Sequence, residues 1–135
     1  MATPTDAPRP PTGLRLSFDV SDLDRTCAFY EVLGGFRVST IRRSGEIFET
    51  RELVSPDFPC LVLVVRAAFG KRAVGTSPGG VTCVGLPVKD LPSTVRRLTG
   101  KARWIGESPE ASPDEPRDCV RLIDPDAYEL ELFRV

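Results

Sequence analysis

A short internal repeat constrains the fold of this chain more than any other feature. The chain contains Val20-Ser21-Asp22-Leu23, and 68 residues later it contains Val88-Lys89-Asp90-Leu91. Before each copy, apolar and polar residues alternate with a period of two, which predicts a strand, and the aspartate stands where a helix N-cap belongs. Three strand-like segments follow each predicted helix. The chain could also be two unrelated α+β halves, but the identical element order favours a duplicated βαβββ unit.

The predicted elements divide the chain into two modules. The first module, residues 13–66, contains a strand at 14–20, a helix at about 22–33, and strands at about 36–42, 46–53 and 60–66. The second module, residues 81–135, contains a strand at 82–88, a helix from 90 to about 98, and strands at about 102–105, 119–123 and 129–134. Residues 1–12 contain four prolines and are expected to be a disordered tail, and residues 67–80 are a linker. Residues 13–135 form one structural domain.

Composition excludes several classes of function. A net charge of −1 argues against nucleic acid as a partner, and no apolar run reaches the roughly 20 residues of a membrane helix. Histidine is absent, which removes Ser-His-Asp and Cys-His catalysis and every histidine metal site. The four cysteines show no CxxC spacing, and the N-terminus has no apolar signal segment. We therefore expect a cytoplasmic protein with reduced, mostly buried thiols.

Three stretches of the sequence carry a resemblance to a known family. They are Leu14 to Phe36, Val81 to Leu98, and the segment Ile123-Asp124-Pro125-Asp126-Ala127-Tyr128-Glu129-Leu130-Glu131-Leu132. Together they resemble the vicinal oxygen chelate superfamily, also called the glyoxalase/bleomycin-resistance/dioxygenase fold. The resemblance implies an α+β fold in which two βαβββ modules form curved mixed sheets around a small-molecule cup.

The resemblance also implies where metal ligands would lie, on the first and last strand of each module. The corresponding positions here are Arg15, Leu63, Cys83 and Glu131. Arginine is permanently charged and donates no lone pair, and leucine has no ligand atom. We therefore expect a member of the family that is deficient in metal ligands and uses no metal and no other cofactor. The alternative is that Asp19 or Glu129 is recruited to a hard cation such as magnesium.

Strand alternation predicts which side chains line the cup. They are Arg15, Ser17, Asp19, Phe48, Leu61, Leu63, Cys83, Trp104, Glu131 and Phe133. Such a wall is mostly apolar with a few placed polar groups, as in many small-molecule sites. Arg15 is either a ligand-binding residue or a structural partner of Glu131 or Asp19, and Cys83 is either a packed side chain or a nucleophile.

These residues support two main functional hypotheses. The first is a metal-independent small-molecule-binding protein that sequesters an antibiotic or a metabolite. The second is a metal-independent isomerase, cyclase or lyase of secondary metabolism, with Glu131 as acid/base and Arg15 as an anion clamp. A non-catalytic regulatory module is a third possibility. We also expect a homodimer with composite sites, each joining the Arg15 module of one copy to the Glu131 module of the other.

Overall fold

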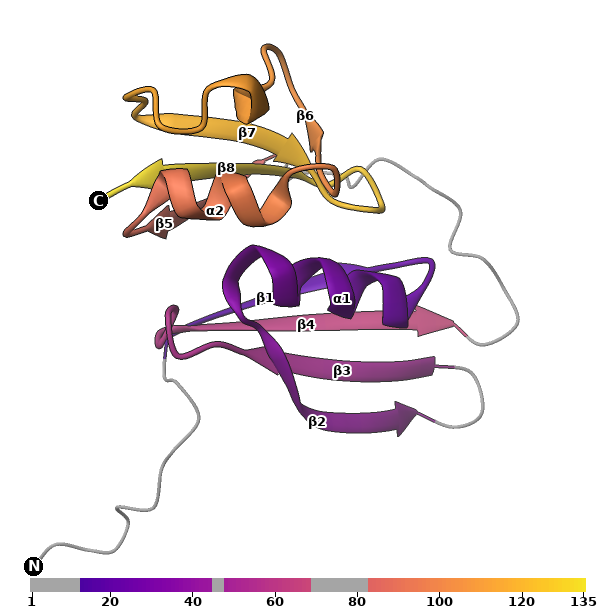
Figure 1. The fold of residues 1–135 in the computed structure, drawn as a ribbon. Coiled ribbons are helices and arrows are strands. Elements are labelled where there is room, and N and C mark those ends of the chain that lie inside the picture. Colours follow the sequence, from indigo (N-terminus) through magenta and orange to yellow (C-terminus); the bar gives the residue numbers. More distant parts are fainter. Residues whose placement is uncertain (1–12, 45–47, 69–82) are drawn as a thin grey trace, which may run out of the picture.

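The computed structural model describes residues 13–44, 48–68 and 83–135 (Figure 1). The first module consists of β1 (Leu14–Asp19), α1 (Leu23–Gly34), β2 (Arg37–Ser44), β3 (Phe48–Val54) and β4 (Leu61–Ala68). The second consists of β5 (Cys83–Val88), α2 (Leu91–Leu98), β6 (Arg103–Trp104), the 3-10 turn η2 (Pro109–Ala111), β7 (Cys119–Ile123) and β8 (Glu129–Arg134).

Each module forms one four-stranded mixed sheet. The strand orders are β1-β4-β3-β2 and β5-β8-β7-β6, so the two sheets have the same topology. In each sheet the first strand pairs in parallel with the last, and the other neighbours are antiparallel. The predicted α+β fold with two βαβββ modules is therefore confirmed.

The repeated aspartates start both helices as predicted. The carboxylate of Asp22 accepts a hydrogen bond from the Arg25 amide, and that of Asp90 accepts one from the Ser93 amide, each at 3.1 Å. These bonds satisfy amides that have no partner within the helix. Helix α1 ends at Gly35, whose φ of 72° lies in the left-handed region that glycine adopts without strain.

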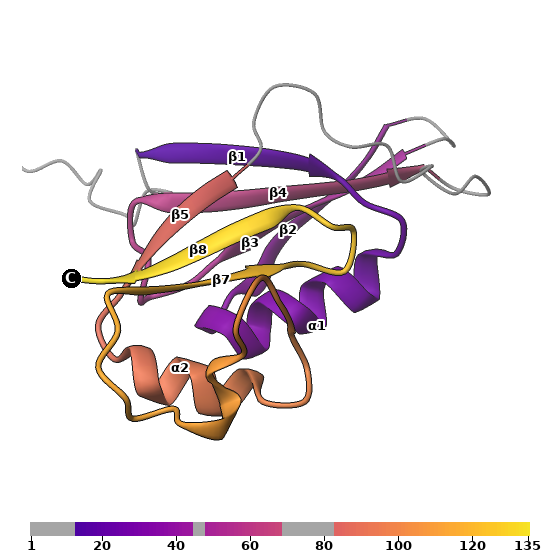
Figure 2. The same ribbon diagram turned by 90° about the horizontal axis from the view of Figure 1, so that it is seen from above.

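Both helices lie between the two sheets (Figure 1), and α1 and α2 are in contact (Figure 2). Their buried faces meet the inner faces of both sheets in one hydrophobic core. Fully buried members of this core include Tyr30, Leu33, Leu98, Leu122 and Leu132. Because the helices occupy the space between the sheets, each sheet turns its other face outward, and we call these the outer faces.

Hydrogen bonds join the two modules at the turn between β7 and β8. The Tyr30 hydroxyl donates to Asp124 Oδ2 at 2.7 Å, and both side chains are almost completely buried. Asp126 Oδ1 accepts from the amide and the hydroxyl of Ser21 at 3.1 and 2.7 Å. In the last turn of α1, the carbonyl oxygens of Val32 and Leu33 accept hydrogen bonds from the guanidinium of Arg97 on α2. These bonds fix the position of one module relative to the other.

Some details differ from the sequence predictions. Strand β4 continues to Ala68, so the strand extends two residues into the predicted linker. The predicted tail (1–12) and most of the linker (69–80) lie outside the described residues. All four cysteines are free, but Cys60, Cys83 and Cys119 are exposed, so the expectation of mostly buried thiols was wrong. Within the described ranges, neither helix has the length and apolar character to cross a membrane.

Candidate functional site

The outer face of the first sheet is set by the parallel pairing of β1 with β4. Arg15 pairs with Val62 and Ser17 with Val64, so these side chains share the outer face. Leu16 pairs with Leu63 and Leu14 with Leu61, which places both β4 leucines on the helix side. Leu63 is 1% exposed, and Leu61 and Leu63 both belong to the core. The prediction that Leu61 and Leu63 line the cup was therefore wrong, and the partly exposed β4 side chain on this face is Val64.

A cluster of three charged side chains lies at the centre of this face. Arg15 Nη2 lies 2.6 Å from Glu52 Oε2, and Arg42 Nη2 lies 3.5 Å from the same oxygen. The Glu52 side chain is only 12% exposed, whereas that of Arg15 is 48% exposed. One largely buried carboxylate is thus shared by two guanidiniums that both reach solvent. The cluster carries a net positive charge and can accept a further anionic group.

The other predicted residues of this face also have partners. Asp19 Oδ1 accepts from Arg66 Nε at 2.9 Å, so the expected Arg15–Asp19 pair does not form. The Arg66 guanidinium carbon also lies 4.9 Å from the centre of the Phe48 ring, within range of a cation–π contact. Phe48 pairs with Ala68 on the outer face, where it was predicted, and Ser17 is exposed beside Val64.

The outer face of the second sheet contains three of the predicted residues, Cys83, Glu131 and Phe133. Cys83 pairs with Glu129 and Gly85 with Glu131, and the alternate residues Leu130 and Leu132 are in the core. A Cβ added at Gly85 would lie 3.2 Å from Phe133 Cε1, so the Phe133 ring lies across the glycine. Desolvation, followed by a hydrogen bond with Glu129, raises the pKa of the Cys83 thiol, which disfavours the thiolate a nucleophile needs.

Glu131 and Arg15 do not pair within one chain. Glu131 is half-buried beside Gly85, and Arg121 lies opposite it on β7, but the Arg121 guanidinium bonds Glu129 instead. Within the described part of the chain, Glu131 makes no hydrogen bond and no ion pair. Its carboxylate is therefore available to a ligand or to a second copy of the chain.

Trp104 does not lie on the outer face. It pairs with Leu122, a fully buried residue, and packs against the core. Its indole Nε1 donates to Glu110 Oε2 at 2.7 Å. The prediction that Trp104 lines the cup was therefore wrong. Strand β6 has only two residues, Arg103 and Trp104, which is too short for alternation to show which side chain faces the core.

Two of the four side chains at the expected metal positions, Arg15 and Leu63, cannot donate a lone pair to a metal ion. Glu131 pairs with Gly85 in the second sheet. Ser17 is the residue of the first module that corresponds to Gly85, and it pairs with Val64, so Val64 takes the place of Glu131 in the first sheet. Valine, like the leucine first assigned there, has no ligand atom, and Arg15 is already bonded to a carboxylate. Among residues 13–44, 48–68 and 83–135, no three histidine, cysteine or acidic side chains gather to bind a metal.

Glu52 was not predicted as a site residue. A strand that alternates through Phe48, Thr50 and Glu52 would place all three on one face, and that pattern is present in the sequence. The neighbouring residues Glu49 and Arg51 are also charged, which hides the alternation. They face the helix, where Arg51 bonds Glu49 and Asp24 at 2.8 Å.

No protein-family model matches this sequence, and no curated protein matches it. Solved structures match with low sequence identity. Trypanothione-dependent glyoxalase I from Leishmania major has a TM-score of 0.72 and 22% identity, covering 90% of this chain and 84% of the other. A glyoxalase/bleomycin resistance protein/dioxygenase domain from Frankia has a TM-score of 0.69 and 20% identity, covering 89% and 88%. A fosfomycin resistance protein from Mesorhizobium loti has a TM-score of 0.64 and 12% identity, also covering 89% and 88%. The chain therefore has the vicinal oxygen chelate fold that these glyoxalase and resistance proteins share.

Proposed function

We propose that the protein binds a small molecule without a metal ion and sequesters it, the ligand being an antibiotic or a metabolite with an anionic group. The observation that carries this proposal is the Arg15–Glu52–Arg42 cluster on an outward sheet face. A fixed guanidinium can bind a carboxylate or phosphonate directly, without a metal bridging the two. Val64, which is partly exposed beside Ser17, supplies the apolar part of such a site.

The binding site is completed by a second copy of the chain in this proposal. The outer face of the first sheet has three arginines, Arg15, Arg42 and Arg66, against two carboxylates. The outer face of the second sheet has Glu129 and Glu131 against Arg121 and, on the edge strand β6, Arg103. The net positive charge of the first sheet and the unpaired Glu131 carboxylate of the second favour contact between the first sheet of one copy and the second sheet of the other. Each cup would then contain Arg15 from one copy and Glu131 from its partner.

One observation favours the alternative, a metal-independent isomerase, cyclase or lyase. Within the described residues the Glu131 carboxylate has no partner, as a group that must exchange protons with a substrate requires. Arg15 would then hold the substrate anion, and Glu131 would move a proton. In a binding protein, Glu131 would only contact the ligand.

Native mass spectrometry of protein purified from its own cells tests binding. We expect the wild-type protein to retain about one small molecule per chain, and we expect Arg15→Ala to lose it. Arg37→Ala is the matched control and should keep the molecule, because Arg37 pairs with Glu31. A molecule recovered unchanged supports sequestration, whereas conversion that stops in Glu131→Gln supports the enzyme. A molecule retained equally by Arg15→Ala contradicts the proposed site.

Elemental analysis tests the expected independence from metal. The residue types at the four expected ligand positions predict no stoichiometric zinc, iron, nickel or manganese in the purified protein. About one metal ion per chain, lost in Glu131→Ala, would contradict this prediction. Metal that survives the substitution would be bound elsewhere.

A further inference from the structure

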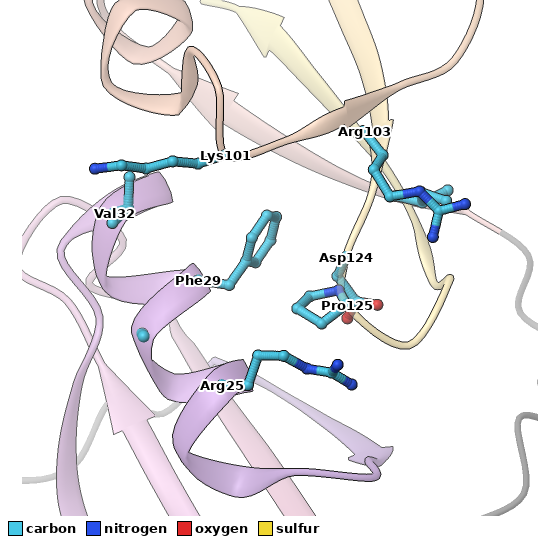
Figure 3. Close-up of a pocket in the computed structure, with 9 residues that line it drawn as sticks. Arg25, Phe29, Val32, Lys101, Arg103, Asp124 and Pro125 are labelled. Carbon is cyan, nitrogen blue, oxygen red and sulfur yellow. The ribbon is translucent and has the colours of Figure 1, made fainter.

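A groove of about 530 Å³ lies between the modules, away from the Arg15 cluster and Glu131. One wall is a stripe of α1 that includes Ala28, Phe29 and Val32, and the other is formed by the ends of β6 and β7 with Pro125. Figure 3 shows the Phe29 ring pointing from α1 toward the second module, with Arg25 and Lys101 on either side of it. The volume is that of a site for a compact organic molecule.

The groove collects basic side chains that have no acidic partner. Most arginines of the described chain form an ion pair, for example Arg66 with Asp19 and Arg96 with Asp114. Among the described residues, the basic side chains without an ion pair are Arg25, Lys89, Arg97, Lys101 and Arg103. Three of these five, Arg25, Lys101 and Arg103, line the groove, and all three are exposed.

The one carboxylate that lines the groove does not neutralise them. Asp124 is 1% exposed, and its oxygens accept hydrogen bonds from the Tyr30 hydroxyl and from the amides of Asp126 and Tyr128. Its lone pairs are directed into the protein. The surface of the groove that solvent reaches is therefore cationic at its rim and apolar along Ala28 and Val32.

We propose that this groove is a second small-molecule site, which takes an organic anion with one carboxylate and a compact apolar body. The apolar body would lie along α1, and the carboxylate would meet the guanidinium of Arg25 or the ammonium of Lys101, which lie on either side of Phe29. The flexible stem of Lys101 crosses Val32 in Figure 3 and allows its charge to follow the ligand. The α1 wall of this site lies between the two sheets, whereas Arg15 and Glu131 of the proposed cup lie on outer faces.

Titration with 2-naphthoate, followed by amide NMR shifts, tests the proposal. We expect saturable shifts at Phe29, Val32 and Lys101, and weaker binding of the uncharged 2-naphthylmethanol. Arg15→Ala should leave these shifts unchanged, which separates the groove from the cup. Shifts confined to β1, β3 and β4, or no saturable shift at millimolar naphthoate, would overturn the proposal.

Charge reversal at the rim supplies the matched comparison. The double variant Arg25→Glu/Lys101→Glu should weaken naphthoate binding about five- to tenfold, because exposed charge pairs each contribute a modest free energy. Lys89→Glu is the control, since Lys89 is also exposed and unpaired but does not line the groove. Equal affinity in the double variant and in the control would contradict a role for the rim charges.

Discussion

The turn between β7 and β8 is built on the carboxylate of Asp124. That carboxylate accepts the Tyr30 hydroxyl and two backbone amides, and Ala127 in the same turn has a φ of 69°. Burial is the main cause that raises the pKa of Asp124 above its ordinary 3.8, although the three hydrogen bonds oppose the shift. Tyr30, Asp126 and Tyr128 are the titratable groups around it. The module junction therefore depends on a carboxylate that is costly to ionise.

This raised pKa predicts how stability depends on pH. Between pH 3.8 and the higher pKa of the folded state, the folded chain keeps a proton that the unfolded chain has lost. Asp124 should therefore add to the free energy of unfolding. This contribution is fully present below pH 3.8 and is lost as the pH rises through the pKa of Asp124 in the folded state. Asp124→Asn cannot titrate, so the stability of the wild type minus that of the variant should decrease from pH 4 to 7. Urea unfolding measures this difference, with Asp57→Asn as the exposed control. A difference that stays level or grows would contradict the assignment.

The Arg15–Glu52 contact predicts coupling between the two residues. In a double-mutant cycle of Arg15→Ala and Glu52→Ala, the stability effects should fall short of additivity by about 0.5–1 kcal/mol. The value is modest because Arg15 is about half exposed and its charge is screened by solvent. The control cycle pairs Arg15→Ala with Glu31→Ala, whose partner is Arg37, and should be additive. Equal coupling in both cycles would mean that the Arg15–Glu52 pair has no specific role.

At the scale of the elements, the sequence predicts what local chemistry determines. The Asp22 and Asp90 caps, both helices and the βαβββ element order follow from periodicity and turn residues, and all are confirmed. The facing of β4 could not be predicted, because residues 61–65 are all apolar and show no alternation. Burial is correspondingly high for both Val62 and Leu63, although they lie on opposite faces. Only the pairing register with β1 reveals which residues face outward.

The end of helix α1 gives a prediction at this scale. Gly35 has a φ of 72°, and its amide donates to the Glu31 carbonyl oxygen at 2.8 Å. Gly35→Ala should lower the free energy of unfolding by about 1 kcal/mol, since alanine is strained in the left-handed region. Gly35→Asn should cost less, because asparagine tolerates that conformation. Thermal or urea unfolding of the two variants measures the difference, and an alanine variant as stable as wild type would contradict it.

At the scale of the whole molecule, the placement of the helices determines what a ligand can reach. Because α1 and α2 lie between the sheets (Figure 1), each sheet has an outer face, and Arg15 and Glu131 lie on the outer faces of different sheets by strand register. Strand alternation predicts that each of them faces away from its helix, but it carries no information on how the two modules pack. Alternation also carries no information on which strands are neighbours in a sheet. Glu52, the partner of Arg15, was missed because it lies 37 residues further along the chain, on another strand.

Intermolecular NOEs in a mixture of labelled and unlabelled copies test the central proposal, a cup formed between two chains, most directly. We expect contacts between the methyl groups of Val64 in one copy and the Phe133 ring of the other, because these residues lie on the outer faces that carry Arg15 and Glu131. Methyl-labelled valine in one population and unlabelled aromatic rings in the other make the signal specific to the interface. A sample without intermolecular NOEs at these residues, or with NOEs confined to other surfaces, would contradict the composite cup.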